Sequence, residues 1–269
     1  MNYELALLLL TSSFVLRTSM YTLKKSLGQH FLKDENISKK IVSSLREIPF
    51  SQLLEVGPGG GALTKYLIQI PDIDFKAVEV DTEKTEYLLK HYPVLAGKII
   101  EESILDLPKP FDKNFTVIGN FPYNISSQIL FRILEWRENV DTVIGMFQKE
   151  VAERVAADPG GKDYGILSVL LGTFFKVEYL FEVSEQAFNP PPKVKSAVIR
   201  LTNLHDPWKV SDYPKLLRLV KAAFGQRRKQ LRNPLKQMFT EETLRDPIFT
   251  KRAEQLAVKD YIELMQRMK

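Results

Sequence analysis

Cysteine is absent from the 269-residue chain, and histidine is nearly so. Without cysteine the chain has no disulfides, no thiolate metal sites and no cysteine nucleophile. The three histidines, His30, His91 and His205, are far apart in the sequence and lack metal-ligand spacing. We therefore expect chemistry based on an organic cofactor, without a metal.

Apolar runs long enough to cross a bilayer, which takes roughly 20 residues, are also lacking. The apolar run from Leu5 to Leu16 is shorter, follows Glu4 rather than a basic residue, and precedes no small-residue cleavage site. We interpret residues 1–19 as an N-terminal extension. The extension would be explained if Met20 is the native start and the sequence begins at an upstream start codon. A membrane anchor and a packed helix are the alternatives. We expect a cytoplasmic protein that does not contact a membrane.

The composition is that of an ordinary globular protein, with 44% hydrophobic and 26% charged residues. The length suits one large domain with a small one, or a single large α/β domain. The formal net charge of +5 is a weak indication of a polyanionic partner.

Between about Gln52 and Thr202, short apolar runs alternate with amphipathic segments. Strands are predicted at 53–56, 75–80, 97–100, 115–119, 141–147, 179–183 and 196–201, and helices at 60–69, 82–92, 126–136 and 148–157. This alternation predicts a parallel sheet covered by helices on both faces. The last two strands have no strong helix between them, which predicts an antiparallel hairpin at one edge.

After Thr202 the strand pattern ends. Short helices are predicted at 215–225, 233–239, 252–257 and 259–268. We place a domain boundary near 204–207, which divides the chain into a Rossmann-like domain at 20–203 and a helical domain at 204–269.

A glycine-rich turn links the strand LLEV to the next helix. Gly57 and Gly59 allow the backbone to turn tightly and approach a ligand. About 20 residues further, Glu79 ends the next strand, where a carboxylate can accept hydrogen bonds from ribose hydroxyls. The pattern predicts a nucleoside cofactor in a Rossmann-like crevice. It also satisfies G-x-G-x-x-A, so NAD and S-adenosylmethionine both remain candidates at this point.

The strand FTVIG ends in a second motif, at Asn120 to Tyr123. The adenine N6 amine is a poor nucleophile because its lone pair is delocalised into the ring. The Asn120 amide oxygen and a main-chain carbonyl at Phe121 or Pro122 could accept the amine hydrogens, favour a tetrahedral nitrogen and stabilise the developing charge. Tyr123 offers a face on which the base can stack. A simple turn is the alternative, but the motif follows the glycine loop in order and favours S-adenosylmethionine over NAD.

Together with their neighbours, these residues resemble the family of small-subunit rRNA adenine N6,N6-dimethyltransferases. The resemblance covers almost everything from Lys24 to Lys269. It rests on SLGQHFL, LLEVGPGGGALT, IGNFPYNISS, FQKEVAERVAADPGGKDYGILSV, AFNPPPKVKSAVIRL and AFGQRRKQLRN. Several distinct motifs in the right order make the resemblance specific. It implies a Rossmann-like S-adenosylmethionine-dependent methyltransferase domain with a small C-terminal all-helical domain.

The resemblance also implies roles for individual residues. His30 and Leu32 would touch the cofactor, Gly57 would line its methionine end and Glu79 would hold its ribose. The target adenine would be flipped out of the RNA and stacked. The residues implied at this adenine are Asn120 and Pro122 in the motif at 120–123, which we call the catalytic loop, with Tyr123 and Phe188 as the stacking pair. The alternative for Phe188 is a core aromatic before a polyproline turn.

The chain departs from the family pattern at three places. Many relatives have Asn at His30 and NLPY in place of NFPY, and both changes look tolerable. The segment IIEESILDL lacks the usual Gly-Asp pair that recognises the cofactor adenine. Ser103 aligns with that Asp, and either its hydroxyl accepts the amine hydrogen bond or Glu102 or Asp106 substitutes.

A one-signed basic run extends from Lys215 to Lys236 and contains no acidic residue. Arg227, Arg228 and Lys229 are our predicted phosphate contacts, which would position RNA without determining sequence preference. A solubilising basic helix is the alternative.

We therefore expect a monomeric enzyme that dimethylates two adjacent adenosines near the 3′ end of small-subunit rRNA in a pre-30S particle. A methyltransferase for adenine in large-subunit rRNA is one alternative. A non-catalytic ribosome-assembly factor with the same fold is the other, since Ser103 alters the cofactor site.

Overall fold

The computed structural model describes residues 30–46 and 48–269. The proposed extension at 1–19 lies outside the described residues. Within the described part, no helix is both long and apolar enough to cross a membrane.

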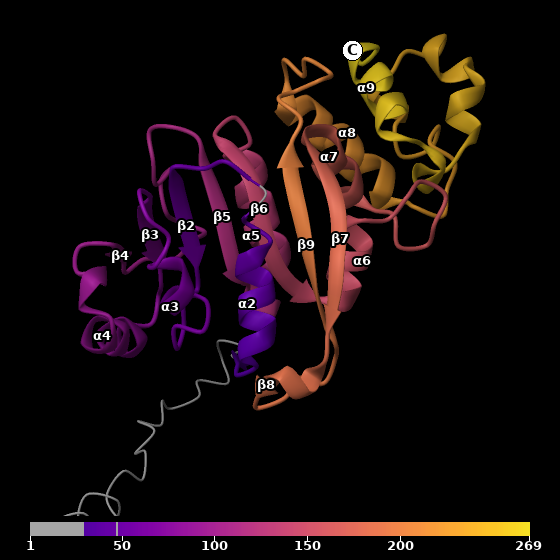
Figure 1. The fold of residues 1–269 in the computed structure, drawn as a ribbon. Coiled ribbons are helices and arrows are strands. Elements are labelled where there is room, and N and C mark those ends of the chain that lie inside the picture. The colour runs from indigo at the N-terminus through magenta and orange to yellow at the C-terminus, as the bar shows by residue number, and fades with distance from the viewer. Residues whose placement is uncertain (1–29, 47) are drawn as a thin grey trace, which may run out of the picture.

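A seven-stranded sheet forms the centre of the molecule (Figure 1). Its four junctions from β4 to β6 are parallel, whereas β9 is antiparallel to both of its neighbours. The spatial order is β4 (Ile99–Ile100), β3 (Asp74–Val78), β2 (Gln52–Val56), β5 (Phe115–Asn120), β6 (Val140–Gln148), β9 (Ser196–Asn203) and β7 (Phe175–Val183). The predicted α/β fold and the antiparallel edge hairpin are both confirmed.

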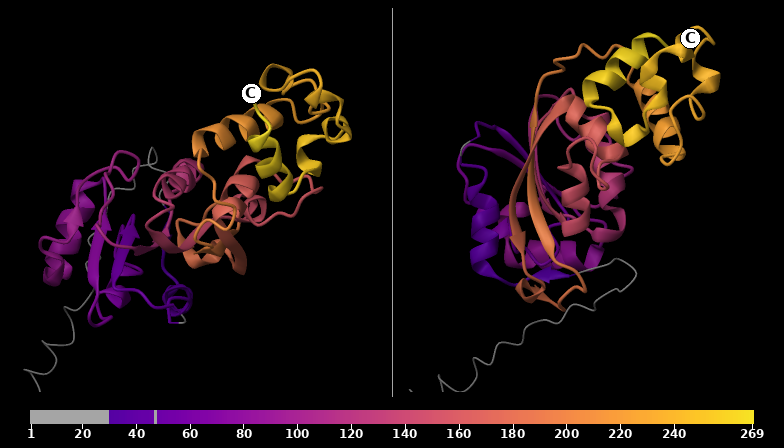
Figure 2. Two further views of the ribbon diagram at one scale, coloured as in Figure 1. Left: turned by 90° about the horizontal axis from the view of Figure 1, so that it is seen from above. Right: turned by 90° about the vertical axis from the view of Figure 1, so that its right-hand side faces the viewer.

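Helices cover both faces of this sheet (Figure 2). Successive strand residues point to opposite faces, so that Leu53 joins one hydrophobic cluster and Leu54 the other. One face packs against α2 (Glu35–Ser43), α3 (Thr64–Leu67) and α4 (Thr82–His91). The other packs against α5 (Ser126–Glu135), α6 (Lys149–Val155) and α7 (Ile166–Phe174). Burial on both faces explains why the central strands are continuously apolar.

Two of these helices differ from the sequence prediction. The segment 60–69 is helical only over α3, because Gly59 and Gly61 adopt positive φ values of 55° and 82° and hold the preceding residues in turns. Helix α7 was not predicted. Its residues are buried on nearly every side, from Leu167 to Phe174, so the sequence shows no amphipathic period there.

A separate two-stranded sheet joins distant parts of the chain. In it β1 (Phe31–Leu32) pairs antiparallel with β8 (Phe188–Asn189), with Leu32 opposite Phe188. The main chain continues this contact, because the Lys33 N–H donates to the Ala187 carbonyl at 2.8 Å. The segment that leads into α2 is thereby fastened to the segment that leads into β9.

The C-terminal part contains two α-helices, α8 (Tyr213–Gly225) and α9 (Val258–Gln266), which pack against α7. The short helices predicted at 233–239 and 252–257 are shorter than expected and are not α-helices. The structure has the 3₁₀ helices η5 (Lys236–Met238) and η8 (Ala253–Gln255) there. Such short segments do not form enough hydrogen bonds to offset helix nucleation, although their apolar residues are buried as predicted.

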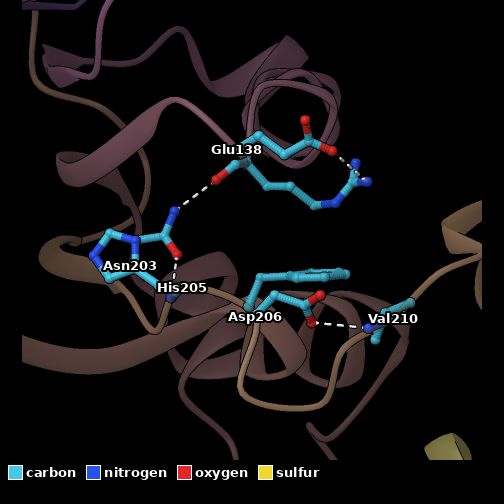
Figure 3. Close-up of a pocket in the computed structure, with 7 residues that line it drawn as sticks. Glu138, Asn203, His205, Asp206 and Val210 are labelled. Carbon is cyan, nitrogen blue, oxygen red and sulfur yellow. Dashed lines mark hydrogen bonds and ion pairs between the residues drawn. The ribbon is translucent and has the colours of Figure 1, made fainter.

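The junction between β9 and α8 surrounds a small hollow of about 210 Å³ (Figure 3). The Asn203 amide donates to the Arg137 carbonyl at 2.6 Å and accepts from the His205 N–H at 2.7 Å. Asp206 accepts from the Val210 N–H at 3.0 Å. These bonds hold the start of the C-terminal part against the end of the sheet, and the hydrophobic cluster continues from α7 into α8 and α9.

Candidate active site

A cavity of about 790 Å³ lies at the carboxyl ends of the parallel strands. This is the edge at which open α/β sheets bind their ligands. The structure brings to this cavity eight of the nine residues that the sequence placed at the cofactor and the target base. They are His30, Leu32, Gly57, Glu79, Ser103, Asn120, Pro122 and Tyr123.

The glycine loop and the catalytic loop lie side by side in this cavity. Gly57 has a φ of 68°, and a Cβ atom there would stand 3.9 Å from Cδ of Pro122 and 4.0 Å from the Asn120 carbonyl oxygen. Gly59 has a φ of 55°, and its Cβ would stand 3.6 Å from the Phe31 ring. The loop therefore brings a bare backbone close to whatever occupies the space between these segments.

The Glu79 carboxylate is buried and held by the main chain. Its Oε2 accepts from the Gly59 N–H and its Oε1 from the Asp81 N–H, each at 3.1 Å. Each carboxylate oxygen can accept a further hydrogen bond. The carboxylate is thus fixed in orientation and still able to bind a diol.

A second carboxylate in the cavity, Glu55, was missed in the sequence. Its side chain is 1% exposed, and its Oε2 atom has no hydrogen-bond partner. Burial raises the pKa of the Glu55 carboxyl to about 8, and the neighbouring charge of Glu79 adds to the shift. A cationic group of a ligand beside Oε2 would favour the ionised form of this carboxyl and give the unpartnered oxygen a contact. The signal in the sequence was a single acid inside the apolar strand LLEV.

The three residues proposed to bind the cofactor adenine, Ser103, Glu102 and Asp106, differ in their position relative to the cavity. Ser103 lines the cavity, whereas Glu102 and Asp106 are exposed and do not. The Ser103 Oγ accepts from the Leu105 N–H at 3.2 Å, which leaves its second lone pair free to accept a hydrogen bond from a ligand and its hydroxyl hydrogen free to donate one. Val80, which is 58% exposed, offers an apolar surface in the same cavity.

The catalytic loop is anchored by the side chain of Phe121. The ring is buried and lies over two glycines, since a Cβ on Gly119 or Gly145 would come within 2.7 Å of it. Its edge meets Phe147, with ring centroids 4.9 Å apart. The Phe121 N–H donates to the Met146 carbonyl at 3.1 Å. The anchored ring therefore fixes the polar groups on either side of it.

The hydrogen-bond acceptors of the catalytic loop differ in how many hydrogen bonds they already accept. The Asn120 Nδ2 donates to the His30 carbonyl at 3.4 Å, which leaves Oδ1 as the acceptor of that amide. The Pro122 carbonyl already accepts from Ser126 Oγ at 3.1 Å and from the Ile125 N–H at 3.2 Å. No hydrogen bond from another described residue reaches the Phe121 carbonyl. Of the two main-chain candidates, Phe121 is therefore the available one.

Tyr123 is held in place from both ends. Its hydroxyl bonds to the Ser196 Oγ, and its ring lies 5.6 Å from the His30 imidazole at an interplanar angle of 30°. Burial raises the pKa of the Tyr123 phenol, so the group stays neutral. The His30 ring is itself fixed by a 2.9 Å contact between Nδ1 and the Pro190 carbonyl.

Phe188 does not occupy the position expected for a stacking residue. Its side chain is fully buried in the hydrophobic cluster and does not line the cavity. Phe188 pairs with Leu32 in the short sheet, and both side chains belong to the same hydrophobic cluster. The structure thus places Phe188 as the core aromatic of the alternative interpretation, and Tyr123 alone of the predicted pair faces the cavity.

The three predicted phosphate contacts differ in their surroundings. Arg228 and Lys229 are exposed, and no described residue forms an ion pair with them. Arg227 instead donates to the Gly161 carbonyl at 3.0 Å and lies 3.7 Å from a Glu254 carboxylate oxygen. Arg227 therefore fastens the loop between α6 and α7 to the C-terminal part.

Among residues 30–46 and 48–269, no three or more His, Asp or Glu side chains gather in a group that could hold a metal ion. The site geometry is that of a nucleoside crevice beside an amide and a free carbonyl.

Comparison with known proteins finds ribosomal RNA methyltransferases that are similar to this chain over most of its length. The chain is 51% identical over 249 residues to the ribosomal RNA small subunit methyltransferase A of Flavobacterium johnsoniae, covering 91% of this chain and 95% of that protein. It is 49% identical over 245 residues to the protein of the same name from Cytophaga hutchinsonii, covering 90% and 95%.

Solved structures share the fold. A dimethyladenosine transferase from Plasmodium falciparum superposes with a TM-score of 0.75 at 24% identity, over 89% of this chain and 99% of that one. The 23S rRNA methyltransferase ErmE superposes with a TM-score of 0.67 at 22% identity, over 88% and 99%. The model of the family described as ribosomal RNA adenine dimethylase matches residues 20–269, and the chain belongs to this family of S-adenosylmethionine-dependent rRNA adenine dimethyltransferases.

Proposed function

We propose that the chain dimethylates N6 of two adjacent adenosines in the 3′-terminal hairpin of small-subunit rRNA. Its family and the names of its relatives support an rRNA adenine dimethyltransferase of the small subunit. The observation that carries the chemistry is the pair of acceptors at the cavity, the Asn120 Oδ1 and the Phe121 carbonyl.

The cavity fits S-adenosylmethionine. The unpartnered Oε2 of Glu55 suits the ammonium of its methionine part, and the bare backbone at Gly57 leaves room for that part. Glu79 would accept the ribose hydroxyls, and Ser103 with Val80 would bind the adenine. His30 and Leu32 would close over the cofactor. When bound, the cofactor supplies an electrophilic methyl group on a sulfonium.

The catalytic loop would prepare the target amine for attack. The two acceptors would each accept a hydrogen bond from one N–H of the N6 amine. This arrangement favours a tetrahedral nitrogen with its lone pair directed at the methyl group. The same acceptors would stabilise positive charge as the new bond forms. Tyr123 would stack on the flipped base, with a contribution of about 1–3 kcal/mol. Pro122 restricts the loop, and Phe188 would support the short sheet from below.

The RNA would be gripped mainly by the helical part. Arg228 and Lys229 are free to contact phosphates, and Arg227 would act through the loop that it fastens. We propose a division into a methyl-transfer domain at 20–203 and an RNA-gripping domain at 204–269. We also propose a monomer that acts in the cytoplasm on a pre-30S particle.

The test is methyl transfer from labelled cofactor to ribosomal subunits that lack the modification, followed by nucleoside analysis. We expect N6,N6-dimethyladenosine in small subunits and none in large subunits. Label in the large subunit would instead support the alternative rRNA substrate. Calorimetric titration with S-adenosylmethionine tests the assembly-factor alternative, which predicts no binding.

A further inference from the structure

A pair of lysines lies directly beside the catalytic loop and has no part in the chemistry above. Tyr123 bonds to Ser196, and Lys195 is the residue before Ser196. The Lys195 carbonyl accepts from the Lys149 N–H at 2.9 Å. Lys149 and Lys195 therefore leave the main chain next to each other, one residue away from the side chain that positions Tyr123.

One carboxylate holds both ammonium groups. Glu182, on β7, bonds to Lys195 and lies 2.5 Å from the Lys149 Nζ. Glu153 is a more distant neighbour, at 3.7 Å from the same Nζ. The side chains of Lys149 and Lys195 are 35% and 50% exposed, so an incoming anion can reach them. Ion pairs at this exposure contribute little to stability and exchange readily with solvent ions.

The position of the pair connects two parts of the protein. Helix α6 begins at Lys149 and runs along β7 and β9 (Figure 1). Beyond its end lies the loop whose Gly161 carbonyl accepts from Arg227. A helix of seven residues spans about 10 Å, so α6 leads from the lysine pair at its start towards the loop that Arg227 contacts. Tyr179, which is 39% exposed, is close enough to both lysines for their charges to lower the pKa of its phenol, although burial raises that pKa overall.

We propose that Lys149 and Lys195 form a phosphate-binding site for the RNA strand next to the target adenosine, and that Glu182 occupies this site until an RNA phosphate displaces it. The proposal rests on the proposed function, because it needs RNA at the catalytic loop. A phosphate between the two ammonium groups would hold the strand where the base enters the cavity. The carboxylate keeps the two lysines together in the free protein and weakens their attraction for other anions.

The decisive variant is Glu182→Gln. If Glu182 only holds the two lysines in place, the variant should bind RNA more weakly, whereas if RNA displaces Glu182, the variant should bind RNA more tightly. Displacement predicts that the variant binds small-subunit rRNA several-fold more tightly at low salt, with a lower KM and unchanged affinity for S-adenosylmethionine. The salt dependence of binding should become steeper, since the phosphate contact no longer competes with an internal anion. The double variant Lys149→Gln/Lys195→Gln should raise the KM about tenfold and reduce the salt slope by about one unit per lost contact.

Glu178→Gln is the matched control. Glu178 lies on the same strand, is 33% exposed against 34% for Glu182, and also lies near two cations, with Lys176 at 3.1 Å and Arg200 at 4.0 Å. The control changes the net charge equally but lies away from the catalytic loop. We expect it to bind RNA as the unaltered protein does.

Binding is measured with an rRNA fragment in the absence of cofactor, which separates this proposal from methyl transfer. Equal effects of Glu182→Gln and Glu178→Gln, or weaker RNA binding by Glu182→Gln, would overturn the displacement. Unaltered RNA binding by the double lysine variant would overturn the phosphate site. If that variant fails to fold, Glu182→Gln alone decides. If the unaltered protein forms no dimethyladenosine but the variants change RNA binding as expected, the result would contradict the proposed function and still support the phosphate site.

Discussion

The cavity at the sheet edge and the basic segment of the C-terminal part use polar groups in opposite ways. In the cavity, Glu79 and Asn120 are held by main-chain hydrogen bonds and are at least partly buried. In the basic segment, Arg228 and Lys229 are exposed and have no ion-pair partner among the described residues. Preorganised groups act over short distances on one geometry, whereas solvated charges act on a whole polyanion. Substitutions in the two regions should therefore differ in both size and kind.

The largest effect is expected at Asn120. Asn120→Ala removes the proposed acceptor of the target amine and should lower kcat about 100- to 1000-fold, as for other preorganised polar groups at reacting centres. Labelled methyl transfer to unmodified small subunits measures this. Asn114→Ala is the control, since Asn114 lies before the other end of β5 and bonds to Asp141. Turnover of Asn120→Ala equal to that of the control would remove Asn120 from its role.

Glu55→Gln should come next. Loss of a charge-assisted contact of about 1.5–3 kcal/mol predicts a cofactor affinity some 10- to 100-fold lower by calorimetry. Glu86→Gln, on exposed α4 surface, is the control. An unchanged affinity would show that the carboxylate does not meet the ammonium.

The same residue predicts a pH dependence of stability. Its folded-state pKa of about 8 lies above the ordinary glutamate pKa of 4.5, which applies in the unfolded chain, so between these values the folded protein binds more protons than the unfolded chain. The Glu55 contribution to the free energy of unfolding should therefore fall as pH rises through this window, by at most about 1.4 kcal/mol per unit. Denaturant unfolding at pH 6 and pH 8 should show this decline relative to Glu55→Gln. Parallel curves for the two proteins would contradict it.

At the exposed basic residues Arg228 and Lys229 we expect a smaller effect, on RNA affinity rather than on turnover. Arg228→Gln/Lys229→Gln should raise the KM for small subunits about tenfold at low salt and flatten its salt dependence, with kcat nearly unchanged. Lys90→Gln/Lys98→Gln, at the opposite edge of the sheet, changes the net charge equally. A fall in kcat with unchanged KM would erase the distinction between the two regions.

The smallest effect is expected at Ser103. Ser103→Ala should weaken cofactor binding about fivefold, since a neutral hydrogen bond contributes about 1 kcal/mol. Ser103→Asp should strengthen it several-fold, because an ionised acceptor binds the adenine amine more strongly. Calorimetry on both variants measures the difference. Equal affinities in all three proteins would place the adenine away from Ser103.

The sequence predicted the cavity better than its surroundings. Motifs at strand ends must meet at one sheet edge, so Gly57, Glu79 and Asn120 could be placed together from spacing alone. Burial was harder to predict, because the pattern shows that Phe188 is aromatic but not which way its ring points. The partners of Arg227 also could not be foreseen, since Glu254 and Gly161 reach it only through tertiary packing.

The short sheet of β1 and β8 has a further consequence. One of its strands directly follows His30, and the other leads to the segment that ends at Ser196, whose Oγ bonds to the Tyr123 hydroxyl. A ligand that shifts either strand must shift the other, because four residues share the pairing. Thermodynamic linkage then requires reciprocity: whatever factor cofactor binding applies to the affinity for RNA, RNA must apply to the affinity for cofactor.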